Sequence, residues 1–451
     1  MKYLVNGSLK QAIHELLASG NDQNLMEFLH ELQPFDIATL LPEFEEPEQL
    51  KILSLTEPEI AAESLEHLNH DDQYRLLDHL PEHIARDILA RMSDDAVADL
   101  VLAIHPRQAQ EILRRVPKED LAGIRLLMTY PDDSAGGIMS LDYIAVREDW
   151  SVSRVINHFR KVGSKATVTN YVYVVDPQGR LAGVTSLKEV LLSDPNTLVS
   201  DIMYTKVVSV PVDAHQEEAA KLLSRYDFVA LPVTEDDGRL VGVIAVDDIL
   251  DVIEEEDTED IHKLGGSQPL DEPYMNSSLF ELVRKRMGWL LVLFIAEGLT
   301  GNILKSYEDV LAQVVALTFF IPLLTDTGGN SGSQASTMVI RAMALGEVTF
   351  KDVAKILWKE LRIGAMLGLI MGTAGFIFSW VIGGSQTVAL TVSVTLMFIL
   401  MLSSTLGAVL PLIGTKFGVD PAVFSAPLIT TIVDATGLLV YFAVASRILN
   451  L

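Results

Sequence analysis

Long apolar runs distinguish the C-terminal part of the chain from the rest. Each run is close to the roughly 20 residues that a helix needs to cross the hydrocarbon core of a bilayer. We place the runs at 287–304, 310–330, 363–383, 387–413 and 422–446. They predict an all-α transmembrane domain of five helices within residues 276–451.

Basic residues mark alternate ends of these runs. Lys and Arg gather on the cytoplasmic side of membrane proteins, so their positions orient the spans. The loop 383–387, between the third and fourth runs, carries no charge. Basic residues precede the first run, lie between the second and third, and lie between the fourth and fifth: Arg284, Lys285, Arg286, Arg341, Lys351, Lys355, Lys359, Arg362 and Lys416. The pattern predicts a multi-pass protein of the cell (inner) membrane, with cytoplasmic N-terminal domains and the C-terminus outside.

Short amphipathic units fill residues 1–130. Segments such as "EIAAESLEHL" and "HIARDILARM" repeat loosely and are separated by Pro, Asp and Asn. Each unit has one apolar face, which a stack of similar units can bury. We therefore expect an α-helical, solenoid-like N-domain. It contains no constellation of catalytic residues.

A β-rich internal repeat follows. "YVYVVDPQGRLAGVTSLKEVLL" aligns with "FVALPVTEDDGRLVGVIAVDDIL", and the shared "GRL" begins at Gly179 and Gly238. Each copy is expected to run strand, helix, strand, turn, strand, helix, with a hairpin at "DPQG" or "EDDG". The repeat resembles a tandem pair of CBS domains, an α/β module that senses nucleotides and ions. We assign the copies to residues 131–200 and 201–253.

The CBS resemblance implies a nucleotide site in the first copy. CBS pairs often hold an adenosine ribose with a hydroxyl and an acid spaced as in Ser186 and Glu189, and Lys188 lies between them. The second copy has Ala245 at the hydroxyl position, before Asp248. ATP is therefore a possible ligand of the first copy. The alternative is that these residues only cap a helix.

Charge is divided as unevenly as hydropathy. The 451 residues include 61 acidic and 34 basic ones, for a formal net charge of −27. From residue 276 onward the two kinds nearly balance, so the front half carries the excess. Such a surface repels nucleic acid and attracts cations. The chain has no Cys, which excludes thiolate metal sites.

Polar residues interrupt two of the apolar runs. Asp434 lies in the middle of the fifth run, and the second ends in Asp326, Gly328, Gly329 and Asn330 after Pro322. An acid at bilayer depth is costly unless it is solvated or paired. We expect the Pro and glycines to loosen and break the helix, freeing carbonyls that only a water-filled or protein-lined site can satisfy.

Oxygen ligands without His or Cys suit Mg²⁺ or Ca²⁺. One mid-span carboxylate per chain is few for a cation site. In a homodimer, the two-fold axis would bring two copies of Asp434 together, which favours a homodimer. The alternative for Asp434 is a structural hydrogen bond between helices. Glu297, a third acid, has the alternative of reaching the membrane interface.

A strongly acidic helix precedes the first run. Residues 247–263 contain nine carboxylates, and one stripe holds Asp248, Asp251, Glu255 and Glu259. The ordinary explanation is a solvated charged face. Few basic residues balance these acids, however, so a shared divalent ion would remove a strong repulsion. Our hypothesis is an ion-dependent latch in a connecting helix, assigned to 254–275 and starting from about 247.

These features together resemble the MgtE family of magnesium channels over essentially the whole chain. The most specific motifs are "TGGNSGSQ" at 327–334, "VDATGLL" at 433–439 and "TEDIHKLG" at 258–265. The resemblance implies a homodimer in the lipid bilayer, with a pore at its two-fold axis that is lined by the second and fifth helices. Asp434 would hold a hydrated Mg²⁺, and Asn330 would be the polar residue of the "GGN" segment.

The resemblance also implies that Mg²⁺ is regulator as well as substrate. The connecting helix would close the cytosolic mouth when Mg²⁺ is plentiful. The matching carboxylates are Asp95, Asp99, Glu217, Asp227, Asp248, Asp251, Glu256, Glu259, Asp260 and Asp420. The helical spacing of the acidic stripe selects Glu255, whereas the family resemblance selects Glu256. Both residues stay candidates.

Three positions depart from the family pattern: Ala426, Asp326 and His215. The first two bear on pore affinity, and His215 on one sensor site. A gated Mg²⁺ channel is the leading function. The alternatives are a membrane-anchored receptor for Mg²⁺ or adenine nucleotide and an ion-coupled exchanger. The sequence has no P-loop motif, which argues against an ATP-driven pump. An enzyme is not expected, because no nucleophile, base and oxyanion set converges.

Overall fold

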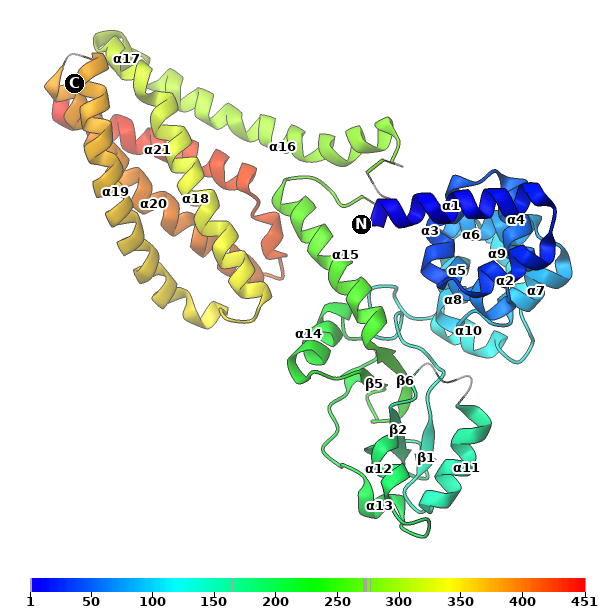
Figure 1. The fold of residues 1–451 in the computed structure, drawn as a ribbon. Helices are drawn as coiled ribbons and strands as arrows, with labels where there is room; N and C mark the ends of the chain where they lie inside the picture. The colour runs from blue at the N-terminus through cyan, green and yellow to red at the C-terminus, as the bar shows by residue number, and fades with distance from the viewer. Residues whose placement is uncertain are drawn as a thin grey trace. The chain divides into compact units, whose positions relative to one another are not determined.

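The computed structural model describes residues 2–163, 166, 168–270, 274–275, 277–383 and 385–450. The chain divides into two compact units, the front unit Met1–Ile253 and the bundle unit Glu254–Leu451. Figure 1 shows helices followed by a small α/β region in the front unit, and long helices in the bundle unit. The expected fold classes are thereby confirmed.

The front unit begins with ten short helices. Their starts follow the sequence: Asn21, Asn69 and Ser93 accept a bond from a first-turn N–H, and Pro stands in the first turn of several others. The helices are α1 (Lys2–Ser19), α2 (Asp22–His30), α3 (Pro34–Leu40), α4 (Glu46–Leu55), α5 (Pro58–Glu66), α6 (His70–His79), α7 (Glu82–Leu89), α8 (Asp94–Ala103), α9 (Pro106–Arg115) and α10 (Leu121–Leu127), with a 3-10 turn at Leu41–Glu43.

The two repeat copies have the same fold. Each has a three-stranded sheet in which the first strand pairs in parallel with the second, and the second pairs antiparallel with the third. Gly179 and Gly238 both have φ near +83°, the left-handed geometry that these hairpins need. The elements are β1 (Ala145–Arg147), α11 (Val152–Val162), β2 (Tyr171–Val175), β3 (Leu181–Ser186) and α12 (Leu187–Leu192), then α13 (Val199–Ile202), β4 (Val210–Pro211), α14 (Gln216–Tyr226), β5 (Ala230–Thr234), β6 (Leu240–Ala245) and α15 (Val246–Leu264).

The first residues of each copy pair with a strand of the other copy. Ser140 bridges to Val243 in the second copy, and Tyr204 bridges to Val184 in the first. One continuous apolar core joins the N-terminal helices to the second copy, from Leu29 and Ile52 to Leu231 and Ile244. The first copy has a separate core around Val155 and Val172.

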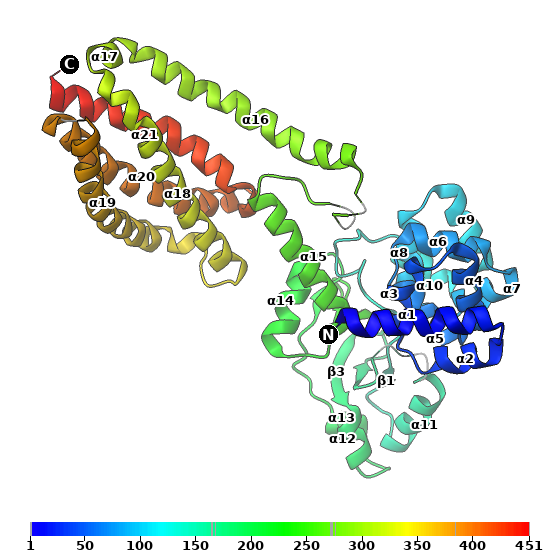
Figure 2. The same cartoon turned by 45° about the horizontal axis from the view of Figure 1, so that its top comes forward.

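In the described part of the bundle unit, five long helices follow the last part of α15 (Figure 2). Helix α20 packs against α18, α19 and α21, whereas α16 packs mainly against α21. They are α16 (Leu279–Ser306), α18 (Ile321–Ala344), α19 (Val353–Gly383), α20 (Gln386–Lys416) and α21 (Ala426–Leu449). Shorter elements are α17 (Glu308–Gln313) and 3-10 turns at Val315–Phe320, Phe350–Asp352 and Pro421–Val423. Part of the expected connecting segment, 271–273, lies outside the described residues.

Within the described residues, four helices are long and apolar enough to cross a membrane: Leu279–Ser306, Phe350–Ile382, Gln386–Lys416 and Ala426–Leu449. The span expected at 310–330 is placed differently. Its first half forms α17 and a 3-10 turn, and the long helix α18 begins only at Ile321. At 24 residues, α18 is about 36 Å long, enough to span a bilayer.

The expected break in this helix is wrong, because α18 is continuous through Gly328, Gly329 and Gly332. Pro322 lies in its first turn, where the missing N–H interrupts no helical bond. The glycines bring neighbouring helices close. A Cβ at Gly328 would crowd Ile399 and Val433, and one at Gly329 would crowd Thr430. They therefore serve helix packing.

Candidate cation sites

Partly buried carboxylates lie where the N-terminal helices join the second CBS copy. Asp95 lies in the first turn of α8, and its Oδ2 accepts from the Ser93 hydroxyl at 3.3 Å. Its Oδ1 is buried and has no hydrogen-bond partner among the described residues. Burial raises the pKa of the Asp95 carboxyl, and the charge of Asp142 adds to this. The unpartnered oxygen makes Asp95 a fitting cation ligand.

Asp248 faces the same region from α15. Its Oδ2 accepts from the Ala245 N–H at 3.3 Å. Burial, followed by the charges of Asp95 and Asp247, raises the pKa of the Asp248 carboxyl to about 7. The structure thus brings together two of the acids selected from the sequence, and their mutual repulsion is what a bound divalent cation would relieve.

Glu66, at the end of α5, was missed by the sequence argument. Its Oε1 accepts from the Ser93 N–H at 2.8 Å, which ties α5 to the start of α8. Burial raises the pKa of the Glu66 carboxyl to about 7, although the bond from Ser93 opposes the change. Nothing in the sequence pairs Glu66 with a residue 27 positions away, so no periodicity could have found it.

We expect this junction to loosen as pH rises when divalent ions are absent. The pKa of Glu66 is raised from 4.5 to about 7, so the folded state holds a proton that the unfolded chain has released. The resulting stability is complete below pH 4.5 and is lost as pH rises through about 7. The loss is on the order of 3 kcal/mol. Hydrogen–deuterium exchange of α5 and α8 in the full-length protein, corrected for intrinsic rates, measures it.

Glu66→Gln should flatten this pH dependence, since a neutral amide keeps an acceptor for Ser93. Glu63→Gln, an exposed position on the same helix, is the matched control and should retain most of the slope. Equal pH dependence in wild type and Glu66→Gln would contradict the assignment.

The remaining front-unit candidates are more exposed. Asp99 and Asp251 are exposed, and Glu217 forms an ion pair with Lys221 at 2.6 Å. Asp227 caps α14 with φ at 53°, a left-handed conformation. His215 caps the start of the same helix by accepting from the Glu217 N–H. Among the described residues no three His, Asp or Glu side chains are grouped so as to hold a metal ion.

Ionic contacts among the described residues join the connecting helix α15 to other parts of the bundle unit. Lys263 Nζ lies 2.6 Å from Glu259 Oε1 and 2.7 Å from Asp420 Oδ2. Arg341, near the end of α18, lies 3.2 Å from Asp257 Oδ1. Glu255 is exposed, whereas Glu256 and Asp260 are partly buried. The sequence selected Glu259 and Asp420 but not the lysine between them.

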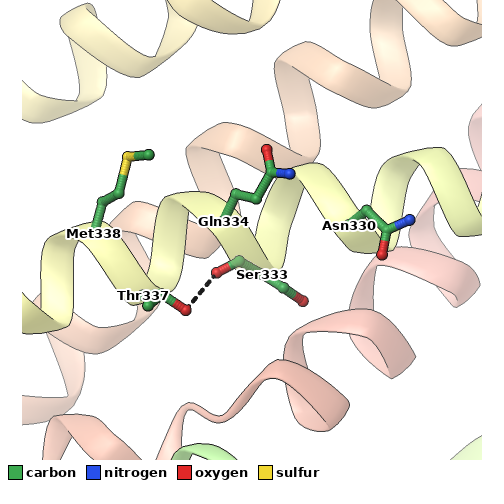
Figure 3. Close-up of a pocket in the computed structure, with 5 residues that line it drawn as sticks. All are labelled: Asn330, Ser333, Gln334, Thr337 and Met338. Atoms are coloured by element: carbon green, nitrogen blue, oxygen red, sulfur yellow. Dashed lines mark hydrogen bonds between the residues drawn. The ribbon is translucent and has the colours of Figure 1, made fainter.

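An exposed polar stripe follows α18. Asp326, Asn330, Gln334 and Thr337 recur at helical spacing on the face turned away from α20. Figure 3 shows Asn330, Ser333, Gln334, Thr337 and Met338 lining a shallow pocket of about 350 Å³ along this helix. Ser333 Oγ also approaches the Ala426 carbonyl at 3.3 Å. A polar stripe on a membrane helix needs water or another protein surface beside it.

Asp434 lies near the middle of α21 and is partly buried. Its Oδ1 is buried without a hydrogen-bond partner among the described residues. Glu297 of α16 and Asp326 of α18 are near enough for their charges to act on this carboxylate. Glu297 and Thr431 also line a cavity of about 510 Å³ between α16 and α21.

The two CBS copies use equivalent acids differently. In the first copy, Glu189 Oε2 accepts from the Ser186 N–H at 3.0 Å and from its hydroxyl at 3.1 Å. The backbone bond from Ser186 lowers the pKa of Glu189, which is exposed beside exposed Lys188. Asp248, at the matching place in the second copy, is partly buried. Its pKa is raised. The equivalent acids of the two copies therefore lie in different electrostatic environments.

Family comparisons match each part of the chain. A divalent cation transporter family, MgtE, matches residues 321–444. The MgtE intracellular N domain matches 32–133, and the CBS domain matches 135–194 and 199–255.

Curated relatives match the whole length. The magnesium transporter MgtE of Thermus thermophilus is 40% identical over 447 residues, covering 98% of this chain and 99% of that protein. The magnesium transporter MgtE of Bacillus subtilis is 31% identical over 435 residues, with 96% of each chain covered.

Among solved structures, the cytosolic domain of the Mg²⁺ channel MgtE in complex with ATP superposes with a TM-score of 0.52 at 39% identity. The superposition covers 54% of this chain and 99% of the solved cytosolic domain. The soluble part of a magnesium transporter superposes with a TM-score of 0.52 at 28% identity. This superposition covers 56% of this chain and 99% of the solved chain. The chain belongs to the MgtE family of magnesium transporters.

Proposed function

We propose that the protein is a channel that conducts Mg²⁺ down its electrochemical gradient into the cell. The observation that carries this is the buried, unpartnered Oδ1 of Asp434 in mid-helix, close to the polar stripe of α18. An isolated acid at bilayer depth is rare and usually marks an ion path. Mg²⁺ retains several waters and needs only one or two carboxylates, which suits so sparse a site.

The driving force is the membrane potential. A doubly charged ion gains about 4.6 kcal/mol per 100 mV, twice the value for one charge. Conduction then needs no coupled hydrolysis. This requires the front unit to face the cytoplasm and the C-terminus to lie outside, as the basic loops indicate.

The pore belongs to a homodimer in this proposal. The exposed stripe of Asp326, Asn330, Gln334 and Thr337 would be costly against lipid. A second copy related by a two-fold axis would place both stripes, with Gly328 and Gly329 behind them, around one water-filled path. Two copies of Asp434 would then share one hydrated ion.

Mg²⁺ in the cytoplasm closes this pore. Asp95 and Asp248 provide a close carboxylate pair, and Asp99, Glu217, Asp227 and Asp251 supply further charge around the second CBS copy. On the connecting helix, Glu255, Glu256, Glu259 and Asp260 play the same part together with Asp420. Mg²⁺ ions shared between these acids would favour a compact arrangement of the N-terminal domains. Loss of the ions would let the domains move apart.

Mg²⁺ flux into proteoliposomes tests the proposal. Wild-type protein should conduct under a negative interior potential at low Mg²⁺ on the front-unit side, and several millimolar Mg²⁺ there should stop the flux. No flux at low Mg²⁺ would exclude a channel and favour a receptor. Flux that requires a counter-ion would favour an exchanger.

ATP binding at the first CBS copy is a second part of the proposal. Glu189 keeps Oε1 available for ribose hydroxyls while Oε2 caps α12 with Ser186, and Lys188 is exposed for a phosphate. The related cytosolic domain crystallised with ATP supports this choice of nucleotide.

Lys188→Ala should weaken ATP binding about tenfold, because a charge-assisted phosphate contact is lost. Equilibrium dialysis on the full-length protein measures this. Lys206→Ala, another exposed lysine of the CBS region, is the control. Unchanged affinity in Lys188→Ala would remove this lysine from the site.

A further inference from the structure

Lys263 occupies the position between two carboxylates that a cation would take. Its Nζ lies 2.6 Å from Glu259 Oε1, one helical turn before it, and 2.7 Å from Asp420 Oδ2. Asp420 stands before the 3-10 turn that leads into α21, 157 positions away in the chain. The ammonium therefore joins the connecting helix to the segment that begins the Asp434 helix.

The surroundings favour a lasting contact over a surface ion pair. The Lys263 side chain is only 28% exposed, and Asp420 has its other oxygen, Oδ1, fixed by the Ala422 N–H at 2.8 Å. Burial by itself would lower the pKa of Lys263, but the bonds to Asp420 and Glu259 raise it above its ordinary range. The lysine thus stays charged at every physiological pH.

We propose that Lys263 is a tethered cation that competes with Mg²⁺ for Glu259 and Asp420 and so determines how strongly the ion controls the connecting helix. The part concerning Mg²⁺ rests on the proposed function. The part concerning the lysine bridge rests only on the distances above.

Mg²⁺ and the Lys263 ammonium compete because both need the carboxylate oxygens of Glu259 and Asp420. A divalent ion that enters between Glu259 and Asp420 must displace the ammonium, because both would use the same carboxylates and their charges repel. The docked helix is consequently held by lysine when Mg²⁺ is scarce and by Mg²⁺ when it is plentiful. The ion then adds less stabilisation than it would to two facing, unpaired acids.

Lys263→Met removes the tethered charge while keeping much of the apolar stem. We expect hydrogen exchange in residues 255–264 of the full-length protein to become about tenfold faster without Mg²⁺. Saturating Mg²⁺ should restore the wild-type rate. The protection that Mg²⁺ adds should therefore be about tenfold larger in the variant, and flux at low Mg²⁺ should be equal to or above wild type.

Lys355→Met is the matched control, because it removes one positive charge from an exposed side chain that pairs with nearby Asp352. It should leave exchange in 255–264 unchanged. The proposal fails if Lys263→Met is as protected as wild type without Mg²⁺, since the bridge would then hold nothing. It also fails if saturating Mg²⁺ cannot restore protection, because the ion would not replace the lysine.

Failure of the proposed function would look different. Wild type and variant would both show flux that ignores Mg²⁺ on the front-unit side, while the faster exchange of Lys263→Met without Mg²⁺ would persist.

Discussion

Asp434→Asn should lower Mg²⁺ flux about a hundredfold in proteoliposomes while leaving the protein folded. Asparagine has nearly the same shape, so the packing of α21 against its neighbours is kept, but the negative charge is lost. Removing one partner of a buried charge interaction costs about 2–5 kcal/mol, and each 1.4 kcal/mol is a factor of ten. The buried Oδ1 has no other described partner, so no hydrogen bond between helices should be lost.

Asp309→Asn is a suitable control for this result, because Asp309 is an exposed acid of short helix α17 in the same unit. It should conduct like wild type. If Asp434→Asn conducts normally, Asp434 is no ion ligand. If it fails to fold, the acid has the structural role that the sequence left open. Elution and thermal unfolding of both variants distinguish these outcomes.

Gly407→Ala should destabilise the bundle unit strongly. A Cβ at this position of α20 would overlap the carbonyl oxygen of Gly332 in α18, so two backbones meet where no side chain fits. Relief requires the helices to separate, which also disturbs the bond between the Ser331 and Ser404 hydroxyls at 3.0 Å. Overpacking of this kind costs about 1–3 kcal/mol, and more where backbone must move. Thermal unfolding in detergent measures the loss.

Gly301→Ala in α16 is the opposite case. Nothing lies within 4 Å of a Cβ there, and alanine stabilises a helix by about 0.5–1 kcal/mol over glycine. We therefore expect an unchanged or slightly higher Tm. Equal effects of the two substitutions would show that the approach of α18 to α20 does not determine stability.

Most helices and strands could be predicted from the sequence, because the patterns that indicate them are local. Helix caps, the two hairpin turns and the apolar runs are each contained in a few neighbouring residues. The second span was misplaced for a physical reason. Hydropathy identifies a span by its apolar residues, but α18 carries Asp326, Asn330 and Gln334 on one face. The hydropathy pattern therefore did not indicate that the helix continues to Ala344.

The candidate sites were predictable only in part. Asp434 is visible because a single acid in an apolar run is rare, and Asp248 because it belongs to an acidic helix. Glu66 with Ser93 and Lys263 with Asp420 are contacts 27 and 157 positions apart, which no spacing rule encodes. The glycines of α18 were recognised as unusual but were assigned to a break, because sequence does not show which neighbour approaches them.

The continuous core of the front unit has a consequence for synthesis on the ribosome. Leu29 and Ile52 are buried in the same cluster as Leu231 and Ile244, which are made much later. At about 5–20 residues per second, roughly ten seconds or more separate the N-terminal helices from the strands that complete their core. During that interval the early helices expose apolar surface, and this nascent domain is where chaperone binding should concentrate.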